Sequence, residues 1–251
     1  MQDAPNTFDM PLSGLETREE WLEKVAEITD EDGYVEPLGA RHTAIFVEDK
    51  PTLLVSFETH AGIAALSEDA QPLGWEMTKA LGWSSLCIVA DGDTWFRDPA
   101  VYAYFDRLVD DGFFEEFDQV IFYGAGPCGY AAAAFSVASP GARVVALAPQ
   151  ASLDPRVAEW DPRFTKMRRT AFDDRYGYAP DMLDAAERAF VIYDPAIEVD
   201  AMHAALFTRP NVTKFRMRFM GERLDESLMR MQILLRVLAQ VSTGKLTRQT
   251  L

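Results

Sequence analysis

The sequence predicts an α/β fold with a doubly wound, mostly parallel sheet and a small cap. Short apolar runs rich in β-branched residues alternate with helical segments along the chain. This alternation is typical of a parallel sheet that carries helices on both faces. Several runs, such as Val144-Val145-Ala146-Leu147-Ala148, are apolar at every position. Strands buried on both faces have this composition, whereas a strand with one solvated face alternates apolar and polar residues.

Strands are predicted where a short run is apolar, rich in β-branched or aromatic residues and bounded by turn residues. In chain order these runs are Thr43–Val47, Thr52–Phe57, Ser85–Ala90, Gln119–Tyr123, Arg143–Ala148, Ala189–Tyr193 and Val212–Phe219. Only Glu48 and Asp49-Lys50-Pro51 separate the first two runs, so we expect them to form a hairpin. That hairpin would place an antiparallel pair at the start of the sheet.

Helices are predicted between these strands, over segments with apolar residues at helical spacing. Asp98-Pro99 has the residue types of a helix N-cap and first turn. In the last helix, a leucine and methionine stripe is typical of a face turned to the core. The predicted helices are Arg18–Ile28, Trp75–Leu81, Ala100–Asp110, Cys128–Ala138, Pro180–Arg188, Asp200–Leu206 and Leu224–Val241.

We expect one domain over residues 1–251, with three irregular segments. Residues 1–16 are polar and contain prolines, so we expect them to be loosely ordered. Residues 30–42 carry acidic residues and glycines and are predicted to be a loop. Residues 149–180 are long for a connection, and a connection of this length needs structure of its own. We therefore expect residues 150–180 to form a cap of short helices over the carboxyl edge of the sheet.

Composition excludes some classes of partner. The chain has 251 residues, 48% of them hydrophobic, and a formal net charge of −16. An acidic surface repels phosphate backbones and anionic lipids, so we expect neither nucleic-acid nor membrane binding. The two cysteines, Cys87 and Cys128, indicate neither a disulfide framework nor a metal site. The first residues lack the pattern of a signal peptide. We expect a cytoplasmic protein without cofactor or metal.

The most informative stretch runs from Asp118 to Ala134. An apolar strand meets a glycine-rich turn, Gly124-Ala125-Gly126-Pro127-Cys128-Gly129-Tyr130, which opens into an alanine-rich helix. This layout resembles the strand–Gly-x-Ser-x-Gly–helix turn, the nucleophile elbow, of the α/β-hydrolase superfamily. It is especially similar to members whose elbow reads Tyr-Gly-Ser-Ser-Met-Gly-Gly-Tyr-Ala-Ala. The resemblance implies a sheet of the α/β-hydrolase type over residues 40–240.

Position by position, the resemblance implies a degraded catalytic triad. The family nucleophile falls on Gly126, which has no side chain. The family acid follows a later strand and falls on Asp194, while the family histidine falls on Glu222. Acyl transfer needs a nucleophilic atom and a base to take its proton. Since the elbow residue is held at positive φ, glycine there relieves strain once catalysis needs no side chain.

A second hypothesis keeps catalysis and moves the nucleophile to Cys128. A thiol in the first turn of a helix has its pKa lowered by the helix dipole and free amides. His60 lies in the loop that in the family faces the elbow, so it could serve as the base. Against this, Cys128 lies two residues past the elbow, where its side chain should point away from the tip. His203 is predicted to be a surface or half-buried histidine.

Ligand-binding residues are expected in two places. One is the carboxyl edge of the sheet, where open α/β sheets bind ligands. The other is the cap, where Trp160 and Arg163 could line a pocket or form a structural ion pair. The loop acids Asp91, Asp93 and Asp98 could bind a cation or merely cap a helix. The candidates are Glu58, Thr59, His60, Trp95, Arg97, Trp160 and Arg163.

The sequence therefore predicts a non-catalytic hydrolase homologue that binds a small molecule or a partner protein. The alternative is a thiol hydrolase or acyltransferase that uses Cys128 with His60. A third possibility is an accessory subunit whose acidic surface docks on a basic partner.

Overall fold

The computed structural model describes residues 8, 10–15 and 17–247. Within these residues, eight strands form one sheet in the order β1-β2-β4-β3-β5-β6-β7-β8. The pairs β1–β2 and β2–β4 are antiparallel, and all the others are parallel. The strands are β1 (Gly33–Leu38), β2 (His42–Val47), β3 (Lys50–Thr59), β4 (Trp83–Ala90), β5 (Gln119–Ala125), β6 (Arg143–Leu147), β7 (Arg188–Tyr193) and β8 (Val212–Arg216).

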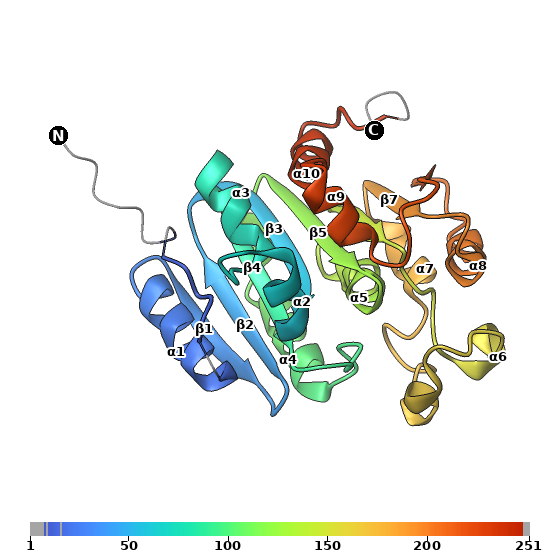
Figure 1. Cartoon of the computed structure of the whole chain (residues 1–251), viewed down its shortest axis with the longest axis horizontal. Helices are drawn as coiled ribbons and strands as arrows, with labels where there is room; N and C mark the ends of the chain where they lie inside the picture. The colour runs from blue at the N-terminus through green and yellow to red at the C-terminus, as the bar shows by residue number, and fades with distance from the viewer. Residues whose placement is uncertain (1–7, 9, 16, 248–251) are drawn as a thin grey trace.

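Helices cover both faces of this sheet, as predicted (Figure 1). One face packs against α4, α5 and α7, and the other against α1, α3, α9 and α10. The helices are α1 (Arg18–Thr29), α2 (His60–Leu66), α3 (Leu73–Leu81), α4 (Pro99–Asp110), α5 (Pro127–Phe135), α6 (Pro155–Ala158), α7 (Ala179–Met182), α8 (Glu198–Leu206), α9 (Leu224–Arg230) and α10 (Leu234–Ser242).

The central strands show why both faces are apolar. In β5, Val120 and Phe122 point to the core under α4 and α5, whereas Ile121 and Tyr123 point to the core under α9 and α10. Successive side chains of a strand point to opposite faces, so an apolar run is buried on both. The run at 144–148 is apolar at every position for the same reason: Val144 lies in the core on one face of the sheet and Val145 in the core on the other.

The predicted hairpin between Thr43–Val47 and Thr52–Phe57 is wrong. β2 pairs with β1 and β4, while β3 lies between β4 and β5 as a parallel strand. The antiparallel pair at the sheet edge is instead β1–β2, in a segment that was predicted to be a loop. β1 reads Gly-Tyr-Val-Glu-Pro-Leu, and its proline masked the strand. Pro37 is tolerated because β1 is an edge strand, where one row of amides needs no partner.

Several helix boundaries also differ from the prediction. The predicted helix Leu224–Val241 is two helices, since Gln232 adopts a φ of 57° between α9 and α10. The predicted helix Pro180–Arg188 is only the short α7 and a 3-10 turn before β7. α2 begins directly after β3, where only a loop was expected, because Thr59 caps it by accepting a hydrogen bond from the Gly62 amide.

Residues 1–7, 9 and 16 of the segment expected to be loosely ordered lie outside the described residues. In its described part, Phe8 packs edge-on against Trp75 at 5.2 Å between ring centroids. The Leu12 amide also donates to the Asp69 carbonyl at 2.7 Å. In the part of the chain that the structure describes, no helix has the length and apolar character needed to cross a membrane.

Candidate functional site

The turn between β5 and α5 has the geometry expected of an elbow. Gly126 links the strand to the helix with φ 56° and ψ −123°, a conformation that glycine adopts far more easily than other residues. Its amide donates to the Leu147 carbonyl at 2.8 Å, and its carbonyl accepts from the Tyr130 amide at 2.9 Å. A Cβ built on Gly126 would meet no atom within 4 Å. The space for an elbow side chain is therefore open, although the chain supplies none.

The two flanking glycines lie where α5 packs closely. A Cβ on Gly124 would lie 2.1 Å from the carbonyl oxygen of Cys128. A Cβ on Gly129 would lie 3.0 Å from the carbonyl oxygen of Leu147. α5 thus approaches β5 closely enough that only glycine fits at Gly124, whereas a Cβ at Gly129 would make a tight contact that needs a small shift of its neighbours.

A cavity of about 190 Å³ lies beside the elbow, and we call it the elbow cavity. Its walls come from the ends of β3 and β5, the loop after β4, and α2, α5 and α9. No residue of the segment 150–180 lines it. The lining residues are Phe57, Glu58, Thr59, Gly62, Leu66, Asp93, Tyr123, Ala125, Pro127, Cys128, Arg223 and Asp225.

Comparison with solved structures identifies the architecture. The chain is similar to a hyperthermophilic esterase from the archaeon Pyrobaculum calidifontis, with 14% identity, a TM-score of 0.50, and coverage of 94% of this chain and 92% of that one. It is also similar to the capsule O-acetyltransferase of Neisseria meningitidis serogroup A, with 10% identity, a TM-score of 0.52, and coverage of 82% and 93%. This chain has the α/β-hydrolase fold.

A further likeness is to the Glycosylation Associate Protein complex from Streptococcus agalactiae. Identity is 15% and the TM-score 0.53, over 86% of this chain and 47% of that one. No protein-family profile matches the chain, and neither does any curated protein. At these identities the likenesses establish the fold alone, because one fold supports many activities.

In α/β hydrolases one oxyanion-hole donor is the amide of the residue after the nucleophile. Here that residue is Pro127, the first residue of α5, and proline has no amide hydrogen. At this turn, therefore, Gly126 offers no side chain and Pro127 no amide hydrogen. The sequence shows that residue 127 is a proline. Only the geometry of the turn shows that this residue begins α5 directly after Gly126.

Cys128 lies in the wall of the elbow cavity and is 8% exposed. Burial raises the pKa of its thiol, and the charges of Glu58, Asp225 and Asp93 raise it further. The predicted lowering of this pKa by the helix dipole is therefore wrong. Desolvation of a thiolate together with nearby carboxylates outweighs the partial charge of a helix terminus.

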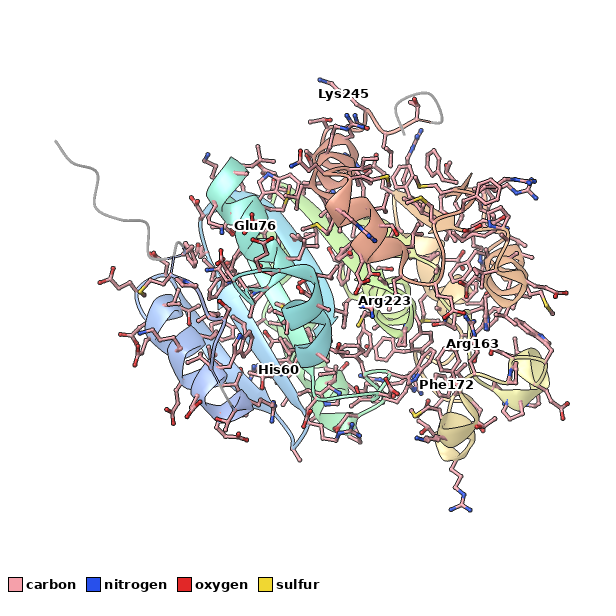
Figure 2. All side chains as sticks on the ribbon, in the orientation of Figure 1. His60, Glu76, Arg163, Phe172, Arg223 and Lys245 are labelled. Atoms are coloured by element: carbon pink, nitrogen blue, oxygen red, sulfur yellow. The ribbon has the colours of Figure 1, made fainter. Side chains whose placement is uncertain are left out.

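His60 does not line the elbow cavity. Its ring packs edge-on against Trp21 of α1, with 5.2 Å between ring centroids. In Figure 2, His60 lies on the side of α2 that faces α1, whereas Arg223 lies at the start of α9. Neither serine nor histidine occurs among the residues that line the cavity.

Glu58 is the most deeply buried carboxyl group of the cavity wall, at 6% exposure. It accepts hydrogen bonds from the Ser56 hydroxyl at 2.7 Å, the Leu73 amide at 3.2 Å and the Cys87 thiol at 3.3 Å. Burial nevertheless raises its pKa. Thr59, the next residue, uses its hydroxyl to cap α2. Both residues line the elbow cavity, and their predicted role in ligand binding stays a prediction.

Asp194, at the acid position, is 2% exposed. Its carboxylate accepts from the amides of Ala196 at 2.8 Å, Met220 at 2.7 Å and Gly221 at 3.0 Å. Burial alone would raise its pKa, but these amides outweigh burial and lower it. Glu222, at the histidine position, is exposed and outside the cavity wall, where Arg223 and Asp225 stand instead. Asp194 therefore holds the loop after β8.

Trp95 and Arg97 contact the protein itself rather than the elbow cavity. Trp95 is 1% exposed and packs against Phe164 at 4.8 Å and Phe172 at 5.9 Å between ring centroids. The guanidinium of Arg97 donates to the Tyr130 hydroxyl and the Arg175 carbonyl and pairs with Asp174. These contacts attach the segment 150–180 to the loop after β4, so the predicted ligand role of both residues lacks support here.

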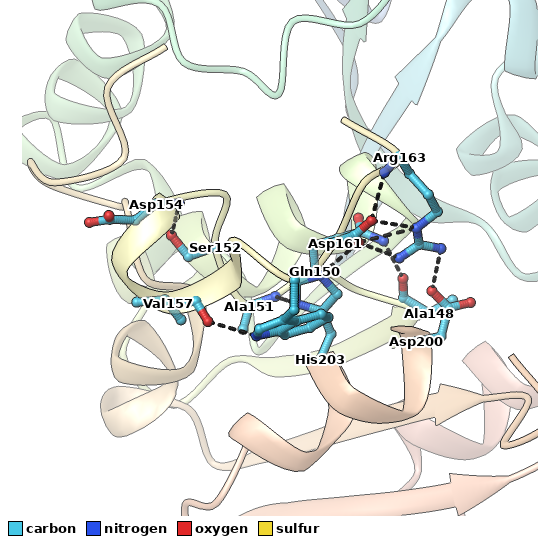
Figure 3. Close-up of polar contacts among 11 residues, drawn as sticks. Ala148, Gln150, Ala151, Ser152, Asp154, Val157, Asp161, Arg163, Asp200 and His203 are labelled. Carbon is cyan, nitrogen blue, oxygen red and sulfur yellow. Dashed lines mark hydrogen bonds and ion pairs between the residues drawn. The ribbon is translucent and has the colours of Figure 1, made fainter. Parts of the chain in front are cut away.

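Trp160 and Arg163 belong to a second internal network, which Figure 3 shows. Arg163 pairs with Asp161 at 2.8 Å and with Asp200 of α8 at 2.7 Å. His203 is fully buried, so the prediction of a surface or half-buried histidine is wrong. Its Nδ1 accepts from the Ala151 amide, so its Nε2–H donates to Asp161 at 3.1 Å. The Trp160 ring lies 4.5 Å from the His203 ring. This network joins the segment 150–180 to α8.

Alanine at Gly124 should destabilise the protein far more than alanine at Gly126. The Cβ at Gly124 collides with backbone, and we expect a loss of about 3 kcal/mol in the free energy of unfolding. At Gly126 the space is open, so only the positive φ opposes an alanine, and we expect the free energy of unfolding to fall by about 1 kcal/mol. Urea unfolding measures both. Gly141→Ala, with φ +85° and open space, is the matched control for the dihedral cost. Equal losses at Gly124 and Gly126 would contradict this account.

Asp161→Asn should weaken the attachment of the segment 150–180 by about 1.5–3 kcal/mol, the usual worth of hydrogen bonds to a charged group. Burial alone would raise the pKa of Asp161, but hydrogen bonds from His203 and Arg163 hold it well below its usual range. Since the folded pKa is depressed, this stability is present above the unfolded pKa of about 3.9 and is lost as pH falls through the folded pKa.

The stability difference between wild type and Asp161→Asn should therefore be largest near neutral pH and shrink in acid. Thermal unfolding across pH measures it. Asp173→Asn changes an exposed carboxylate of the same segment and should have little effect at any pH. A stability difference between wild type and Asp161→Asn that grows as pH falls would contradict a depressed pKa of Asp161 in the folded protein.

Proposed function

We propose that this protein is a non-catalytic protein of the α/β-hydrolase fold that binds a small molecule in the elbow cavity. The observation that carries the proposal is the elbow itself, where Gly126 presents no side chain to an open space. Acyl transfer at this turn has no atom to form the covalent bond.

Three further features support loss of catalysis over its relocation. Pro127 supplies no amide for an oxyanion hole. The carboxylate of Asp194 is engaged by the backbone amides of Met220 and Gly221. The Cys128 thiol has a raised pKa, and His60 packs on Trp21. Each group that acyl transfer would need is therefore either absent or engaged in a structural contact.

Retention of the cavity supports binding. Glu58 keeps a buried carboxyl group there with a raised pKa, and strongly perturbed groups in clefts are typical of functional sites. A protein partner in place of a small molecule stays a prediction, as does a cytoplasmic location.

The purified protein should not hydrolyse p-nitrophenyl acetate or butyrate faster than its heat-unfolded control. Gly126→Ser should remain inactive, because a hydroxyl without a base or an oxyanion donor is a weak nucleophile. Release of p-nitrophenol measures both. Saturable turnover by the wild type that disappears in Cys128→Ala would overturn the proposal in favour of a thiol hydrolase.

Cys128 should resist alkylation by iodoacetamide at neutral pH in the folded protein, because only the thiolate reacts and its formation is disfavoured. Mass spectrometry of peptides locates the label. Cys87, which is buried and also has a raised pKa, is the internal control, and both should react in urea. Rapid labelling of Cys128 alone in the folded protein would instead favour a reactive thiol.

A further inference from the structure

The elbow cavity is acidic, and its charges come from separate parts of the chain. Glu58 lies next to the last residue of β3, Asp93 follows β4 and Asp225 lies in the first turn of α9. Among the described residues of the cavity wall, Arg223 is the one with a permanent positive charge. Its guanidinium pairs with Glu226 at 2.7 Å and more loosely with Asp225 at 3.9 Å, and its side chain is 57% exposed. The cavity therefore keeps an excess of carboxyl groups.

Tyr123 adds an unused polar group to the same wall. It is 2% exposed, and its hydroxyl has no hydrogen-bond partner among the described residues. A buried hydroxyl without a partner is unfavourable, and native structures rarely tolerate one without a reason. Because Tyr123 lines the cavity, a ligand there could supply the missing hydrogen bond.

The remaining wall limits the size and kind of ligand. Phe57, Leu66, Ala125 and Pro127 are apolar, and the volume of about 190 Å³ is below the ~300 Å³ at the lower end of ordinary ligand pockets. No group of three or more His, Cys, Asp or Glu in the described residues is placed to hold a metal ion. A small organic cation with a short apolar part fits these walls better than a metal.

We propose that the elbow cavity binds a small primary amine as its ammonium ion, between the carboxylates of Glu58 and Asp225 and within reach of the Tyr123 hydroxyl. The inference rests on the proposed function, because it names the ligand class of the same cavity. An ammonium group offers three donors and no acceptor, which suits two carboxylates and a hydroxyl oxygen. The apolar wall then covers the carbon chain.

The same groups predict how binding depends on pH. Burial raises the pKa of both Glu58 and Asp225. Asp93, Arg223, Tyr123 and Cys128 are the other titratable groups that face the cavity. A bound cation favours the ionised carboxylates, so it lowers their pKa values and releases protons. Affinity should therefore rise with pH through the raised carboxyl pKa values.

The test uses three probes of one shape: n-butylammonium, n-butanol and butyrate, titrated calorimetrically into the full chain at low ionic strength. We expect n-butylammonium to bind, and n-butanol and butyrate to bind at least about tenfold more weakly. We also expect its affinity to be higher at about pH 8 than at about pH 5, since carboxyl groups with raised pKa values are more fully ionised there. Equal or tighter binding of butyrate or n-butanol would overturn the inference.

Matched variants locate the binding. Glu58→Gln and Asp225→Asn should each weaken n-butylammonium about tenfold, and Tyr123→Phe about threefold. Asp69→Asn removes an acidic group from a neighbouring hollow, outside the elbow cavity, and should leave the affinity unchanged. Asp225→Asn, at the start of α9, keeps the test decisive if Glu58→Gln fails to fold. Unchanged affinity in Asp225→Asn would overturn the inference.

The ester assay on the same samples separates the two proposals. Ester turnover at the elbow refutes the non-catalytic function, whatever the amine result. Absence of turnover with binding of butyrate or n-butanol in preference to n-butylammonium refutes only the ligand class.

Discussion

The close approach of α5 to β5 is the constraint on which the site depends. With the Cys128 carbonyl oxygen 2.1 Å from the position of a Cβ on Gly124, the strand and helix meet at a distance that only glycine allows. This contact sets the sharp turn at Gly126 and directs it toward the carboxyl ends of β3 and β4. The turn is also the joint between the central strand β5 and its helix α5. The proposed loss of catalysis therefore need not disturb the fold.

Residues at the expected acid position and in the loop expected to face the elbow make structural contacts in this chain. Asp194 binds the amides after β8, Thr59 caps α2, and His60 packs against α1. The contacts of Asp194 and Thr59 satisfy polar groups that would otherwise be buried without a partner, whereas the His60 contact is ring packing. What remains at the elbow is a small cavity whose buried carboxyl groups Glu58 and Asp225 have raised pKa values. Such a cavity favours a ligand that brings positive charge.

Local patterns predicted the central strands correctly, because residues buried on both faces are apolar at every position. They failed at the sheet edge, where β1 is a strand in spite of Glu36 and Pro37, since an edge strand needs neither full burial nor every amide. The hairpin failed for a different reason. Strand pairing is a non-local choice, and β2 pairs with β1 and β4 rather than with its neighbour in sequence. The break at Gln232 in the last helix left no periodic signal.

The sequence by itself determined what the elbow lacks: Gly126 has no side chain and Pro127 no amide hydrogen, whatever the surroundings. It also placed Glu58 and Asp194 at strand ends, because apolar runs stop there. Only the tertiary structure decided the state of each group. Burial and three carboxyl groups from distant segments raise the pKa of Cys128, and His203 is buried against Asp161. Desolvation and Coulomb interactions depend on which segments meet in space, and one-dimensional spacing carries no information about that.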